Sequence, residues 1–166
     1  MSSPRFSQSH GIVPIITPLA ANYNTITAAE ESVDMSLYNH ATFIFLFSAD
    51  MAGDSGVLTM SAGLTNGAAD AAATFTVRYG SAACLSATAD VLSATSASVA
   101  TVTLTTANCL SKVMVIEVDN EDMNVSGVQY RYLTPAYDDA GTAGIFSCVA
   151  ILSEPRYEKD VMRTAI

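Results

Sequence analysis

The chain has 166 residues, of which 50% are hydrophobic and only 14% are charged, and its formal net charge is −9. This length suits one ordinary domain with a real core, and the composition argues against a chain kept disordered by high charge and low hydrophobicity. The acidic balance and the scattered arginines argue against nucleic acid and anionic membrane surfaces as partners.

Residues 1–36 are apolar but too interrupted to form a helix, because Pro14 and Pro18 fix φ and remove backbone donors. We expect an extended, polyproline-like N-terminal arm that needs a surface to cover it. That surface is either a neighbouring subunit of an assembly or the arm's own domain. The candidate contact residues of the arm are Ile12, Val13, Ile15 and Ile16.

The same prolines break the first apolar stretch, so it does not read as a signal peptide. No apolar stretch approaches the length of a membrane-spanning helix. We therefore expect a soluble product made inside the cell. The three cysteines are far apart and odd in number, which favours reduced, apolar residues over a disulfide framework or a zinc site, with one bridge left open: Cys84, Cys109 and Cys148.

Residues 37–153 show short strand patterns separated by turn signals and no convincing amphipathic helix. The expected strands, in chain order, are 41–50, 57–61, 74–79, 98–106, 112–119, 128–135 and 145–152. The first is a continuous apolar run, so we expect it to be buried on both faces, and we expect the last to be deeply buried. The pattern predicts a single all-β domain, an antiparallel β-sandwich or jelly roll. Residues 154–166 are expected to leave it as a polar C-terminal tail.

The sequence offers little catalytic chemistry. His40 stands where the first strong strand begins, and a structural histidine bonded to backbone is favoured over a catalytic base. A thiol dyad with Cys148 is disfavoured, because that cysteine lies within an apolar strand. Residues 119–122 lack the spacing and glycine of a calcium loop. We therefore expect no catalytic residue, no cofactor, no metal site and no enzyme activity.

Several segments carry a resemblance to a known family: "DMSLYNHATFIFLFSADMAGDSGVLTMSAG", followed by "TFTVRY", "KVMVIEVD", "VQYRYLTP" and "IFSCVAILSEPRY". Together they resemble the capsid cement, or decoration, proteins encoded among the head genes of tailed bacteriophages. The similarity covers roughly residues 34 to 157 and rests on strand order, the "YNHATFIF" opening and the "PRY" close. It supplies no catalytic residues.

The resemblance implies a virion structural protein on the capsid exterior, made in the host cytoplasm. Such a protein binds between subunits of the major capsid protein, stabilises the shell, and forms trimers or dimers at local symmetry axes. On this interpretation the arm and the tail make the inter-subunit contacts. The candidate residues are Ile12, Val13, Ile15, Ile16, Pro155, Arg156 and Tyr157.

Two alternatives stay open. One is a phage tail or fibre component, or a carbohydrate-binding sandwich in which Tyr130, Tyr132 and Tyr137 replace the missing tryptophans. The weaker one is a small hydrolase that uses Asp138 or Asp139.

Overall fold

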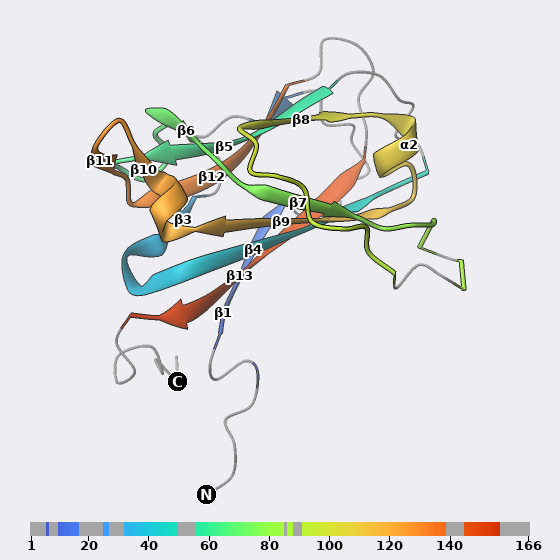
Figure 1. Cartoon of the computed structure of the whole chain (residues 1–166), viewed down its shortest axis with the longest axis horizontal. Coiled ribbons are helices and arrows are strands. Elements are labelled where there is room, and N and C mark those ends of the chain that lie inside the picture. The colour runs from blue at the N-terminus through green and yellow to red at the C-terminus, as the bar shows by residue number, and fades with distance from the viewer. Residues whose placement is uncertain are drawn as a thin grey trace, which may run out of the picture.

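Two antiparallel β-sheets face each other in the computed structural model of the chain (Figure 1). This arrangement confirms the predicted all-β, sandwich-like single domain. The structure describes residues 6, 10–16, 25–26, 32–49, 56–84, 86–87, 91–138 and 145–156, with only the backbone described at 25–26.

The first sheet has five strands in the order β1–β13–β4–β9–β7, and every neighbouring pair is antiparallel. Thus β1 and β7 form its edges. The strands are β1 (Gly11–Ile16), β13 (Phe146–Pro155), β4 (Tyr38–Phe47), β9 (Val113–Asp119) and β7 (Thr76–Tyr79).

The second sheet has the order β2–β12–β5–β6, with β3 also paired to β12 and β8 paired to β5. Its strands are β2 (Thr25–Ile26), β12 (Tyr132–Asp138), β5 (Gly56–Gly63), β6 (Ala71–Ala73), β3 (Val33–Asp34) and β8 (Thr101–Leu104). The remaining elements are short: the hairpin strands β10 (Asn124–Val125) and β11 (Val128–Gln129), and the helical turns η1 (Met35–Leu37), α2 (Thr106–Cys109) and η2 (Asn120–Met123).

The core lies between the two sheets and is built from alternate residues of their strands, because successive side chains of a strand point to opposite faces. In β4 these are Ala41, Phe43, Phe45 and Phe47, and in β13 Phe146, Cys148, Ala150 and Leu152. The second sheet contributes Tyr137, whose ring packs edge-on against Phe146 with centroids 5.3 Å apart. Such an aromatic pair adds specific geometry to the burial of area.

The expectation that the first strand is buried on both faces is wrong. Burial alternates along β4 and β13, and Leu46 is 49% exposed beside the fully buried Phe45. The reason is the architecture: an antiparallel sheet of a two-layer sandwich faces the core on one side only. The apolar residues between the core positions therefore lie on the outward face.

The expected strand at 128–135 is divided into two elements. Ser126 (φ 55°) and Gly127 (φ 80°) form a tight turn, and β10 pairs with β11 across it. After this hairpin the backbone forms hydrogen bonds with other parts of the fold. The Tyr130 N–H donates to Met123 O and the Arg131 N–H donates to Gly63 O. The main strand β12 starts only at residue 132. Likewise β8 ends before Thr106, where α2 begins.

Parts of the predicted arm and tail belong to the sandwich. Gly11–Ile16 pairs with β13 as an edge strand, where Pro14 is tolerated and is followed by a register shift. At the other end, β13 extends through Pro155, which pairs with Tyr38, and the Arg156 N–H donates to Leu37 O at 2.9 Å. The sequence boundaries at 36 and 153 thus fall inside elements attached to the sheets.

The two edges of the first sheet are treated differently. Residues 91–99 run along the edge of β7. Two of their serines form the hydrogen bonds that a neighbouring strand would otherwise form. The Val77 N–H donates to Ser96 Oγ and the Tyr79 N–H to Ser93 Oγ, both at 2.9 Å. The serine N–H groups return bonds to the carbonyls of Val77 and Tyr79. A covered edge does not invite pairing with another chain.

An ion pair joins β3 to the start of β12. Arg131 Nε donates to Asp34 Oδ1 at 2.9 Å, and the same oxygen accepts the Ser36 N–H at the start of η1. The Arg131 guanidinium is the main reason that the pKa of Asp34 falls to about 2. The carboxylate raises the pKa of Arg131 in return.

Candidate functional site

The outward face of the first sheet is apolar. The strand register places its residues in cross-strand rows, of which Ile12–Ile151–Thr42–Glu117 is one. The next row is Pro14–Val149–Ile44–Val115, and the third contains Leu46 and Val113. We call the apolar members the aliphatic face: Ile12, Pro14, Ile44, Leu46, Val113, Val115, Val149 and Ile151.

The aliphatic face is not part of the core. Ile12 and Leu46 are about half exposed, at 51% and 49%, and the central residues such as Ile44 and Val115 are partly buried. Scattered exposed aliphatic side chains are ordinary on a protein surface, but a contiguous group of them marks an interaction site. This contiguity makes the face the candidate functional site.

A polar row borders the aliphatic face, with His40 at its centre. His40 Nδ1 lies 2.7 Å from Asp119 Oδ1, and Nε2 lies 3.2 Å from Thr42 Oγ1 and 3.8 Å from Glu117 Oε1. The histidine is therefore held by side chains of its own face, and the expected bond to backbone is not what positions it.

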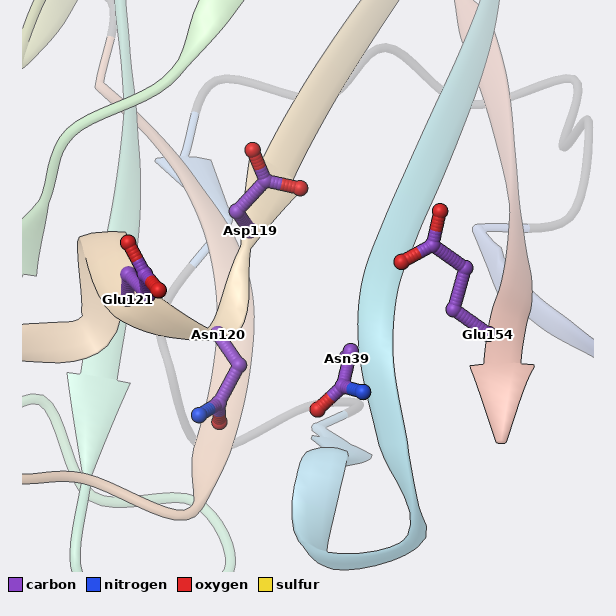
Figure 2. A pocket seen from close by; sticks show the side chains of 5 residues that line it. All are labelled: Asn39, Asp119, Asn120, Glu121 and Glu154. Atoms are coloured by element: carbon purple, nitrogen blue, oxygen red, sulfur yellow. The ribbon is translucent and has the colours of Figure 1, made fainter. Parts of the chain in front are cut away.

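A pocket of about 560 Å³ lies at this end of the sheet, lined by Asn39, Asp119, Asn120, Glu121 and Glu154. Figure 2 shows Asp119 on β9 and Glu154 on β13 on either side of β4. Glu154 has a φ of 55°, which breaks the regular alternation of β13 at this point. The described lining contains three carboxylates and no basic side chain, so the pocket favours positively charged groups.

The order Thr42–His40–Asp119 is that of a hydroxyl, an imidazole and a carboxylate in a hydrolase triad. However, Glu117 places a second carboxylate beside Nε2, where it would repel a negatively charged intermediate. A dyad with Cys148 is ruled out by geometry, because Cys148 points into the core, where burial raises the pKa of its thiol. The arrangement suits binding better than nucleophilic catalysis.

The remaining polar candidates are dispersed. All three cysteines are free thiols, with Cys109 and Cys148 buried and Cys84 exposed. Within the part of the chain that the structure describes, no group of three or more histidine, cysteine or acidic side chains is placed to hold a metal ion. Asp138 is exposed at the end of β12, whereas Asp139 lies outside the described residues.

The tyrosines do not form a sugar platform. Tyr137 is 2% exposed and belongs to the core. Tyr130 packs partly against the core, while the Tyr132 ring lies beneath the Arg131 guanidinium, with 5.0 Å between the carbon of that group and the ring centroid. The three rings therefore serve different parts of the fold.

The structure separates the predicted contact residues into three groups. Ile12 is exposed and borders Ile151, so it belongs to the aliphatic face. Ile15 and Ile16 are each 7% exposed and belong to the core of their own domain. Their assignment as inter-subunit contacts assumed that they need another surface to cover them, and their own domain covers them. Val13 packs against that core.

The third group lies at the far end of β13. Pro155 takes part in the strand ladder, and Arg156 Nε donates to Tyr38 O at 3.3 Å. Tyr157 lies outside the described residues. An inter-subunit role for these residues stays a prediction.

Sequence reasoning missed the centre of the aliphatic face. Ile44, Leu46 and Val115 stand in strands that were correctly expected, but the apolar runs around them indicated burial. The signal that identifies them is the antiparallel order of the strands, because it leaves one face of each sheet uncovered by the core.

Comparisons of this chain with protein-family models, with curated proteins and with solved structures found no match. Among the described residues, the helices are all too short or too polar to cross a membrane.

Proposed function

We propose that this chain is a virion structural protein of the capsid cement type. It binds the outside of a bacteriophage capsid between subunits of the major capsid protein and stabilises the shell. The observation that supports this proposal most directly is the aliphatic face. The sandwich already has a filled core, so a second contiguous apolar surface suits docking to another protein.

The chemistry of the site agrees with a structural role. The polar row beside the aliphatic face joins histidine to carboxylates and a threonine, and Glu117 disfavours an anionic reaction intermediate. A cement protein needs no reaction. It contributes binding energy to the closed shell at many symmetry-related sites, and this stabilises the bound form by mass action.

The net charge of −9 also suits the capsid exterior. Particles that carry an acidic outer layer repel one another and stay dispersed. Self-association into trimers or dimers at local symmetry axes is part of the proposal, as are the contacts of the segments that flank the sandwich.

The test is the native size of the protein in the lysate that produces it, measured by gradient sedimentation with antibody detection. We expect the protein to run with particles of megadalton mass, and imaging of those particles then locates it on the head or on the tail. Localisation on the tail would replace cement with the tail or fibre alternative. Sedimentation as a free species of one to three chains would contradict a virion role altogether.

A further inference from the structure

We propose that the aliphatic face and the carboxylates beside it form one composite docking surface for a partner segment that presents aliphatic side chains next to lysine or arginine. We call the carboxylates the acidic rim: Glu117, Asp119, Glu121 and Glu154. The inference rests on the proposed function, in which the partner is a shell subunit, and it adds the chemistry that this subunit must offer.

The geometry joins the two parts of the surface. Glu117 stands in the same cross-strand row as Ile151 and Ile12, so the rim begins within the aliphatic face itself. Asp119 follows two residues later on β9, which is a distance of about 7 Å along a strand. A partner that covers the face thus brings its own side chains against these carboxylates.

The charges of the rim are not neutralised by the described part of the chain. The carboxylates of Glu121 and Glu154 form no ion pair with any described residue, and those of Asp119 and Glu117 share the single imidazole of His40. No described lysine or arginine side chain forms an ion pair with any of these four carboxylates.

The described basic side chains are engaged elsewhere. Arg78 and Lys112 donate to the carbonyls of Ser93 and Ala107, Arg131 pairs with Asp34, and Arg156 donates to a carbonyl of β4. Arg78 belongs to the outward face, but it lies at the β7 edge, across the sheet from β1. Among the described residues no lysine or arginine forms an ion pair with the rim, so in this proposal the partner supplies the positive charge.

The same charges argue against a second copy of this chain as the occupant. Two copies joined through this face would bring two acidic rims together, and each copy carries a net charge of −9. Like charges brought together at an interface oppose association, whereas complementary charges increase the association rate and specificity. A basic and aliphatic partner satisfies both halves of the surface.

The test uses the full chain and purified particles, with attachment measured by co-sedimentation. Leu46→Asp places a charge in the aliphatic face, and Glu117→Lys reverses a charge of the rim. The matched controls are Val57→Asp and Asp138→Lys, which lie opposite each other on the outward face of the second sheet. Thermal unfolding of each variant shows that it is folded.

We expect each substitution on the first sheet to weaken attachment about tenfold or more, and each control to leave it within about twofold. Attachment of the unchanged protein should weaken as salt rises, and Glu117→Lys should reduce that dependence. If the protein attaches and all four variants attach equally well, the docking surface is wrong while the proposed function stands.

If the protein does not attach to particles at all, the proposed function fails and the surface is tested alone. The probe is then a short peptide of alternating lysine and valine, added to the labelled full chain while amide chemical shifts are recorded. Shift changes centred on Leu46, Val115 and Ile151 support the composite surface, provided that a glutamate–valine peptide and a lysine–serine peptide cause none. Equal responses to the three peptides, no response, or concentration-dependent dimers formed through this face would overturn it.

Discussion

The outward faces of the two sheets differ in chemistry although both are made by the same alternation of strand residues. On the first sheet the outward positions of the central strands carry Ile44, Leu46 and Val115. On the second sheet the register brings Thr134 beside Ser61 and Ala136 beside Thr59, with Thr101 next to Thr59. The central rows of the first face are aliphatic, whereas those of the second are built from hydroxyls and small side chains, with Val57 opposite Asp138 at one end.

On the outward face of the second sheet, hydroxyl groups form hydrogen bonds with other groups of the same chain. Thr134 Oγ1 lies 2.7 Å from Ser32 Oγ, which also accepts the Gly67 N–H, and Thr59 Oγ1 donates to Ala136 O. Aliphatic side chains cannot form such hydrogen bonds with one another. An aliphatic face is stabilised only when it is removed from water. This difference is the reason that our proposal places the docking surface on the first sheet.

The largest effect is expected from making the two faces alike. The triple variant Ile44→Thr, Leu46→Thr, Val115→Thr gives the first sheet the hydroxyl chemistry of the second and keeps the β-branched or strand-compatible character of the positions. We expect attachment to particles to fall by about a hundredfold, because three apolar contacts are lost together. Co-sedimentation measures the loss, and urea unfolding shows whether the sandwich persists. Unchanged attachment would show that the contrast between the faces has no bearing on docking.

The inward side should tolerate far less than either outward face. A Cβ placed on Gly56 would clash with Tyr137 Oη and lie 2.5 Å from Cε2 of the same ring. Because the Tyr137 ring is buried, we expect Gly56→Ala to lower the free energy of unfolding by about 2–3 kcal/mol. The control is Gly127→Ala, which meets no atom within 4 Å and suffers only from its φ of +80°. Urea denaturation of both variants makes the comparison, and equal losses would contradict the steric explanation.

The ion pair at β3 gives the second sheet a pH-dependent attachment. Asp34→Ala should lower stability at neutral pH by about 1 kcal/mol, mainly through the lost capping bond to Ser36. Asp34→Asn keeps an acceptor for that bond and should cost less. The folded-state pKa of Asp34 is about 2 against an ordinary 3.8, so its ionic contribution is present above the higher value and is lost as pH falls through the lower one. The difference in free energy of unfolding between the original chain and each variant should therefore shrink as pH falls from 7 to 2, measured by denaturation. A difference that grows in acid would contradict this assignment.

The smallest effect concerns the covered edge of β7. Ser96→Ala removes the acceptor of the Val77 N–H and should cost about 0.5–1 kcal/mol. Hydrogen exchange should show faster exchange at Val77, with little change at Tyr79, whose N–H keeps its bond to Ser93. Exchange that accelerates equally at both amides would mean that the whole covering segment has detached.

The sequence predicted the class of fold because strand patterns are local. The runs at 112–119 and 145–152 correspond closely to β9 and β13, since alternation and β-branched residues specify a strand wherever it is placed. The division near Tyr130 was missed, because it depends on backbone bonds to Met123 and Gly63 that only the folded chain brings close.

The candidate site was harder to predict than the fold. Ile15 and Leu46 look equally suited to burial in the sequence, yet one fills the core and the other lies half in solvent. What separates them is the position of the opposite sheet, a long-range property. The contact of His40 with Asp119 has the same origin, because it follows from the pairing of β4 with β9 across 79 positions of the chain.

The unequal edges of the first sheet also limit how copies of the protein can combine. Residues 91–99 occupy the β7 side, whereas β1 pairs with β13 alone among the described strands. Among the described strands, an edge-to-edge contact between two first sheets is therefore open only to β1 of each copy. Such a contact is two-fold symmetric and uses the same strand edge of each copy, so by itself it joins two copies and does not extend into a fibre.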